Sequence, residues 1–180
     1  MKEVELKLVS ELMKNSRRSD RDLAKAIGVS QPTVTRIRNK LEKEGYIREY
    51  TMIPDFCKLG FEIAAVTFVK FGKELTPEII DKVTKGGLEL EKKSPTPTIM
   101  ILRGLGLGYE GIFISFHEDY PSFLKLMELT KQLPFVDIAH VESFLVSLPE
   151  EYQYRHLTLS NIANYLLKLK EKREKKGEKS

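Results

Sequence analysis

Apolar residues recur at helical spacing in the first 45 residues and predict three helices joined by short turns. The expected helices cover residues 2–14, 20–27 and 30–44. Gly28 and Gly45 follow the second and third helices, as expected of residues that end a helix with a positive φ. Ser30 is the expected N-cap of the third helix. The next residues, 46–53, are strand-like.

The second half of the chain alternates between β-rich and helical patterns. Strands are expected at 61–71, 98–102, 112–116 and 136–148, and helices at 76–87 and 120–133. Gly86 and Gly87 are expected to end the first of these helices. The order β-α-β-β-α-β predicts a ferredoxin-like domain, in which two helices pack on one face of an antiparallel sheet. The predicted fold class is therefore α+β.

A last amphipathic helix is expected at 159–170, before a Lys/Glu-rich tail. This helix could pack on its own domain, bridge subunits or cover the sheet. The tail includes Lys168, Lys170, Lys172, Arg173, Lys175 and Lys176. The tail is expected either to be solvated or to contact DNA phosphates through these charges. The expected domains are 1–53 (DNA binding), 54–60 (linker), 61–149 (sensing and dimerisation) and 150–180 (C-terminal helix and tail).

The third helix has two opposite faces, as a helix that enters the major groove of DNA requires. Val34, Ile37 and Leu41 share one narrow arc and are expected to face the core. The opposite arc is polar or basic and has no acidic residue in its first three turns. The expected DNA-binding residues are Arg17, Arg18, Ser30, Gln31, Thr33, Thr35, Arg36, Asn39 and Lys40. Gln, Thr and Asn would read bases, and Arg and Lys would grip phosphates or guanine.

The distribution of charge along the chain agrees with a DNA-binding N-terminal part and a different role for the middle of the chain. Net charge is +4 over residues 1–60, −4 over 61–156 and +4 over 157–180. Cys57 is the single cysteine, so no internal disulfide can form. No stretch is apolar enough for a membrane span, and the N-terminus lacks the pattern of a signal peptide. We therefore expect a cytoplasmic protein.

The passage DRDLAKAIGVSQPTVTRIRNKLEKEGYIREYTMIPDFCKLGFEIAAVTFVKF, at residues 20–71, resembles the Lrp/AsnC family of regulators. In that family a winged helix-turn-helix leads through a Leu-Gly step, here Leu59-Gly60, into a sensing domain. The resemblance implies a homodimer built by sheet-on-sheet contact of the second domains, with octamers also known. It also implies double-stranded DNA with palindromic operators, and control by an amino acid or related small molecule. The helix at 159–170 departs from the family, whose chains usually end after the last strand.

The glycine-rich passage 104–111 holds a G-x-G-x-x-G pattern, but a strand is expected after it instead of the helix that a dinucleotide site needs. It is either a hairpin loop or the lining of an effector pocket. By resemblance, the effector residues would be Gly106, Gly108, Tyr109 and Glu110. The glycines are more numerous than usual in the family, and Glu replaces the common Asp.

Other kinds of site find less support in the sequence. His117, His140 and His156 have no spacing typical of metal ligands, and no cofactor is expected. No serine has the setting of a nucleophile, so we do not expect an enzyme. Two alternatives stay open: an architectural protein that coats DNA with little specificity, and an enzyme on the same fold, such as a tetrapyrrole decarboxylase.

Overall fold

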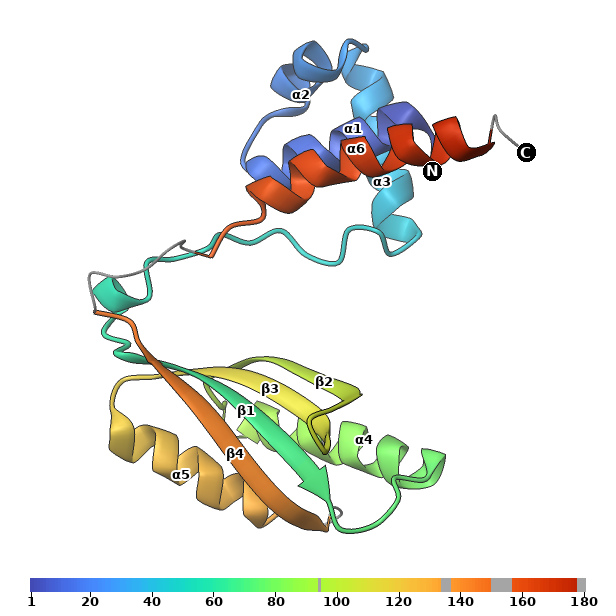
Figure 1. Cartoon of the computed structure of the whole chain (residues 1–180). Coiled ribbons are helices and arrows are strands. Elements are labelled where there is room, and N and C mark those ends of the chain that lie inside the picture. The colour runs from blue at the N-terminus through green and yellow to red at the C-terminus, as the bar shows by residue number, and fades with distance from the viewer. Residues whose placement is uncertain (94, 134–136, 150–156, 178–180) are drawn as a thin grey trace. The chain divides into compact units, whose positions relative to one another are not determined.

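The computed structural model describes residues 1–93, 95–133, 137–149 and 157–177, without the side chains of 86–90, 92–93 and 170–177. The elements in chain order are α1 (Glu3–Lys14), α2 (Asp20–Ile27), α3 (Gln31–Lys43), the 3-10 turn η1 (Cys57–Leu59), β1 (Ile63–Phe71), α4 (Pro77–Lys93), β2 (Thr98–Gly106), β3 (Tyr109–His117), α5 (Tyr120–Lys131), β4 (Ile138–Ser147) and α6 (Ser160–Gly177) (Figure 1). The mixed helix-and-sheet class is thus confirmed.

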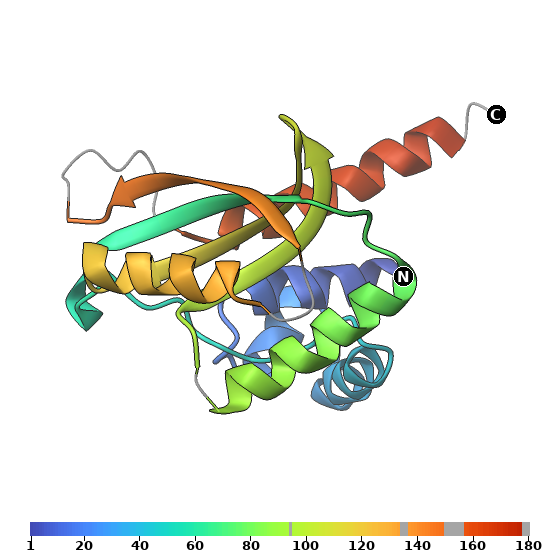
Figure 2. The same cartoon turned by 90° about the horizontal axis from the view of Figure 1, so that it is seen from below.

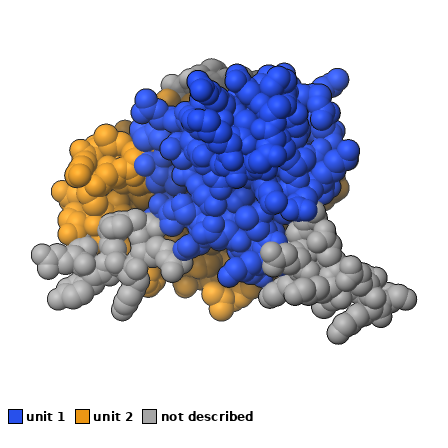
Figure 3. Space-filling view, turned by 90° about the horizontal axis from the view of Figure 1, so that it is seen from above, with its two compact units in different colours: residues 1–53, 155–180 blue, residues 54–154 orange. Residues whose placement is uncertain are grey.

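The chain divides into two compact units, coloured separately in Figure 3. Unit 1 comprises residues 1–53 and 155–180, and unit 2 comprises 54–154. The C-terminal part of the chain therefore returns to the N-terminal unit. The four domains expected from the sequence stay a prediction.

Unit 1 is a helical bundle around one apolar core. The core consists of Leu8, Leu12, Leu23, Ala24, Val34, Ile37 and Leu41. The inward arc predicted for α3 is therefore confirmed. Helix α2 begins as expected, because the Ser19 side chain accepts the backbone N–H of Asp22. It ends at Gly28, whose φ of 73° suits a residue without a Cβ.

Helix α6 lies along α1 within unit 1 (Figure 1). The Ser10 Oγ donates a hydrogen bond of 3.0 Å to the Ala163 carbonyl oxygen, and both residues are fully buried. The structure shows packing on the N-terminal unit, a position that the three alternatives for this helix did not name. The expected contacts of Lys170 to Lys176 involve side chains outside the described residues.

Unit 2 contains one antiparallel sheet with the strand order β2-β3-β1-β4. Helices α4 and α5 lie on the same side of it (Figures 1 and 2). The core between α5 and the sheet contains Ala65, Val69, Phe113, Phe123, Leu126 and Met127. This is the predicted ferredoxin-like arrangement.

The expectations for residues 46–53 and for the end of α4 were wrong. Residues 46–53 form no strand, because no described strand pairs with this segment and backbone hydrogen bonds are what stabilise a strand. Helix α4 continues through Gly86 and Gly87 to Lys93. Each glycine costs a helix only about 1 kcal/mol relative to alanine, and the residues that follow, LELEKK, favour helix.

Candidate nucleic-acid interface

The outer face of α3 is presented by a rigid support. Val34 and Leu41 are fully buried and Ile37 nearly so, which fixes the rotation of the helix about its own axis. The turn at Gly28–Ser30 sets its direction relative to α2. Ser30 is the N-cap residue as expected, but its hydroxyl shares a 2.8 Å hydrogen bond with the Thr33 hydroxyl and does not cap the helix backbone.

Five residues of this face line a shallow, open hollow: Gln31, Pro32, Thr35, Arg36 and Asn39. All five are exposed. Among the described residues the side chains of Gln31, Arg36 and Asn39 have no hydrogen-bond or ion-pair partner, so their donors are available. The structure thus brings together four of the residues predicted to bind DNA, and Pro32 lies among them.

Thr35, unlike Gln31, Arg36 and Asn39, has a side-chain partner among the described residues. Its hydroxyl donates a 2.6 Å hydrogen bond to the Asp20 carboxylate at the start of α2. Arg38 forms an ion pair with the other oxygen of that carboxylate. Asp20 thereby ties the first residue of α2 to two residues of α3.

Arg38 also contacts the ring of Tyr50, in addition to its ion pair with Asp20. Its guanidinium carbon lies 5.5 Å from the centre of the Tyr50 ring, and the Tyr50 hydroxyl donates a 2.6 Å hydrogen bond to Glu42. Burial opposes the charge on Arg38, but hydrogen bonds with Tyr50 and Asp20 outweigh it and raise the pKa of the guanidinium. Arg38 is therefore permanently charged and has a structural role.

Lys40, predicted to contact phosphate, is engaged within the protein. Its ammonium lies 2.7 Å from the carboxylate of Glu5, which is buried, and 3.8 Å from that of Glu44. The hydrogen bond between Lys40 and Glu5 raises the pKa of Lys40 and lowers that of Glu5. This pairing reduces the positive charge that Lys40 can offer to DNA.

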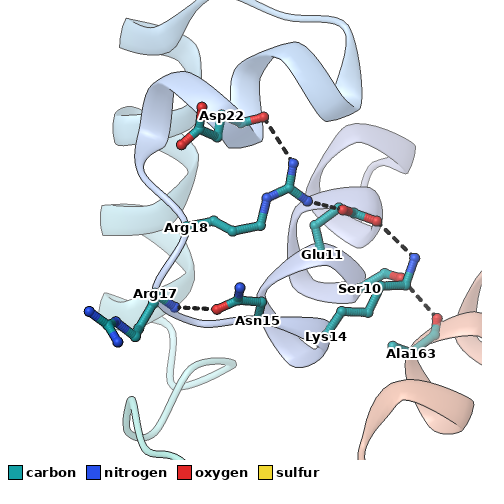
Figure 4. Close-up of polar contacts among 8 residues, drawn as sticks. All are labelled: Ser10, Glu11, Lys14, Asn15, Arg17, Arg18, Asp22 and Ala163. Atoms are coloured by element: carbon teal, nitrogen blue, oxygen red, sulfur yellow. Dashed lines mark hydrogen bonds and ion pairs between the residues drawn. The ribbon is translucent and has the colours of Figure 1, made fainter.

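Of the two arginines that precede α2, Arg18 is paired within the protein and Arg17 is more accessible (Figure 4). Arg18 pairs with Glu11 and donates a 3.2 Å hydrogen bond to the Asp22 carbonyl. Within the part of the chain that the structure describes, Arg17 is engaged through its backbone N–H alone, which donates to Asn15, and its side chain points away from this network. Arg17 is consequently the more available of the two for a phosphate.

Sequence reasoning missed the roles of Asp20, Arg38 and Tyr50. An acidic residue at the start of a helix, such as Asp20, ordinarily favours the helix by its charge alone, and Arg38 lies between the two arcs of α3. The partners are separated by 15 positions for Asp20 and Thr35 and by 18 for Asp20 and Arg38. Local periodicity contains no signal for such pairs, because they form only after α2 and α3 have packed.

The expected effector loop in unit 2 is a tight hairpin. Strands β2 and β3 extend through the glycine-rich passage, Gly106 pairs with Tyr109, and only residues 107 and 108 form the turn. Leu107 and Gly108 both have positive φ, 54° and 82°, as in a type I′ turn. Of the two alternatives for the passage 104–111, the hairpin is confirmed, with a turn of two residues, and a role in binding an effector stays a prediction.

The four expected effector residues do not converge on one site. Glu110 accepts a 3.0 Å hydrogen bond from the backbone N–H of Phe71 and lines a concavity with Lys73, Glu74 and Arg103, among others. Tyr109 instead bonds to Glu142, and this hydrogen bond raises the pKa of the Tyr109 hydroxyl to about 12. Gly106 and Gly108 do not line the concavity.

Comparison with known proteins agrees with this architecture. Residues 1–48 match the family model described as winged helix-turn-helix DNA-binding. The chain is 39% identical over 80 residues to a Pyrococcus horikoshii protein named as the uncharacterized HTH-type transcriptional regulator PH0061, covering 44% of this chain and 51% of that protein. It is 38% identical over 64 residues to the HTH-type transcriptional regulator LrpC of Bacillus subtilis, covering 36% of this chain and 43% of LrpC. These sequence matches thus span about half the length of the curated relatives.

Similarity to solved structures extends over both units. The crystal structure of PH0061 matches with a TM-score of 0.68 and 26% identity, covering 88% of this chain and 97% of that one. The Neisseria meningitidis regulator NMB0573, solved as a complex with L-Met, matches in fold with a TM-score of 0.66 and 16% identity, covering 90% of this chain and 99% of that one.

The chain thus combines a unit that matches the winged helix-turn-helix model with a ferredoxin-like unit, and the crystal structure of PH0061 has a similar fold. The chain is similar in its N-terminal sequence to LrpC and in fold to a regulator of the AsnC family from Agrobacterium tumefaciens, as the resemblance indicated. That α6 is an extension of the family's usual chain stays a prediction. Among the described residues, no helix combines the length and apolar character that crossing a membrane requires.

Proposed function

We propose that this protein is a sequence-specific transcription regulator that binds double-stranded DNA through the outer face of α3. The observation that carries the proposal is the exposed group of Gln31, Arg36 and Asn39, whose side chains have no partner among the described residues. Side-chain amides suit adenine, and the Arg guanidinium suits guanine or phosphate. The naming of the relatives PH0061 and LrpC as HTH-type transcriptional regulators supports the same function.

The regulator acts as a homodimer joined through unit 2. The face of the sheet opposite α5 carries the apolar side chains of Met100, Leu102, Phe144 and Val146, which are 39–66% exposed. The strand register places Phe144 opposite Val66 and Val146 opposite Ala64, so these side chains share one face. An exposed apolar sheet face of this kind is typical of an interface, and a twofold dimer is the usual arrangement.

A small molecule is the third part of the proposal. The structural neighbour NMB0573 was solved with L-Met, which supports an amino acid as the class of effector. In this chain the concavity at Lys73, Glu74, Arg103 and Glu110 contains charges of both signs, as a zwitterionic ligand requires. The proposed role is regulatory binding and not catalysis.

Selection of binding sites from a random DNA library tests the function. We expect the full-length protein to enrich a palindromic site and Arg36→Ala to bind that site more weakly. Loss of this one contact would cost on the order of 1–3 kcal/mol. Binding with a steep salt dependence but without any enriched sequence would instead identify an architectural protein. A chain that binds no DNA would refute the proposal.

A further inference from the structure

The hydroxyl of Thr35 is already used inside the protein. Its single proton is donated to Asp20 at 2.6 Å, and the hydroxyl oxygen also lies 3.3 Å from the Gln31 carbonyl oxygen. A hydroxyl has one hydrogen to donate, so Thr35 cannot donate it to a base while this bond persists. The side chain still offers the acceptor capacity of its hydroxyl oxygen and, as its apolar group, the methyl.

The Asp20 carboxylate that holds this hydroxyl is itself fixed. Its second oxygen is paired with Arg38, and Arg38 is held by the Tyr50 ring. Asp20 is on α2 and both partners of its carboxylate are on α3, so the bond to Thr35 joins two helices that share one core. Thr35 therefore keeps its orientation when α3 approaches DNA.

The position of Thr35 is central on the outer face. Gln31, Thr35 and Asn39 follow one another at intervals of four residues, a spacing of about 6 Å along a helix. Pro32 lines the same hollow beside Thr35 and has no side-chain donor or acceptor. The middle of this row is thus suited to an apolar group, with an amide on either side.

We propose that Thr35 selects thymine by contact of its methyl group with the thymine 5-methyl group, and that Asp20 is the positioning residue for this contact. The thymine methyl is the one apolar group that base pairs present in the major groove, and a threonine methyl is a known partner for it. This inference rests on the proposed function, because it assumes that the face of α3 enters the groove.

The experiment uses the full-length protein and its selected operator, with each thymine replaced singly by deoxyuridine, which lacks the 5-methyl group. We expect one thymine per half-site at which this replacement weakens binding about fourfold, the value of one buried methyl group. Thr35→Val loses the bond to Asp20, but valine in a helix keeps one strongly preferred χ1 rotamer by itself and carries a methyl at both branch positions, so this variant should retain the sensitivity. Thr35→Ser keeps the hydroxyl, lacks the methyl and should lose the sensitivity.

Asp20→Ala tests the positioning role, since a released Thr35 side chain should discriminate less between thymine and deoxyuridine. Thermal unfolding verifies that each variant is folded, and Thr35→Val and Thr35→Ser remain informative if Asp20→Ala unfolds. An operator without any methyl-sensitive thymine, or a Thr35→Ser variant that keeps the sensitivity, would overturn the inference alone. Absence of any enriched operator would overturn the proposed function and this inference with it.

Discussion

The packing of α6 on α1 predicts that residues from opposite ends of the chain stabilise one folded unit. Ala163 is fully buried, and its carbonyl oxygen accepts a hydrogen bond from Ser10 of α1. Overfilling a packed site typically costs about 1–3 kcal/mol, so Ala163→Leu should lower the free energy of unfolding of unit 1 by that amount. Ser10→Ala removes the buried hydrogen bond to the Ala163 carbonyl and should cost about 1 kcal/mol.

Thermal unfolding followed by circular dichroism measures both effects. For a domain of 60–100 residues, about 1 kcal/mol corresponds to a shift in Tm of about 4–8 °C. Asn164→Leu is the matched control, because Asn164 neighbours Ala163 on α6 but is exposed. Equal unfolding temperatures for Ala163→Leu and Asn164→Leu would refute the packing of α6 on α1.

Three further predictions concern other parts of the chain. Burial lowers the pKa of His117 below its ordinary 6.5, so the unfolded state binds the proton more readily and unit 2 should lose stability as pH falls below about 6.5. Urea unfolding between pH 5 and 8 measures this loss, and a His117→Gln variant with the same pH dependence would contradict it. Gly28→Ala places a Cβ at a φ of 73° and should lower the free energy of unfolding by about 1 kcal/mol. Gly104→Ala, in open surroundings without a positive φ, is the control in the same denaturation assay. Phe144→Glu on the open sheet face should dissociate the proposed homodimer in sedimentation velocity, and an unchanged dimer would place the interface elsewhere.

The sequence predicts best what depends on neighbours along the chain. Helix α2 was predicted with its observed bounds, since Ser19 and Gly28 are local signals for its two ends. The inward arc of α3 follows directly from helical periodicity. Expectations failed where a tertiary context decides: a segment at 46–53 without a partner strand, and a Gly86-Gly87 pair within a helix that continues.

The candidate site shows the same limit at the level of side chains. Periodicity identified the outer face of α3, and the structure brings Gln31, Thr35, Arg36 and Asn39 together there. Periodicity could not separate Arg36, whose side chain has no partner among the residues that the structure describes, from Lys40, which pairs with Glu5 of α1. The distinction depends on contacts between helices, which helical periodicity does not specify.

The central claim is that the outer face of α3 reads DNA, and a competition binding measurement tests it most directly. The native protein and Arg36→Ala are titrated against the selected operator in the presence of excess scrambled DNA, over a range of salt concentrations. We predict that Arg36→Ala binds the operator at least tenfold more weakly, about 1.4 kcal/mol or more, while it remains fully folded. Operator binding by folded Arg36→Ala that equals native binding at every salt concentration would contradict the account.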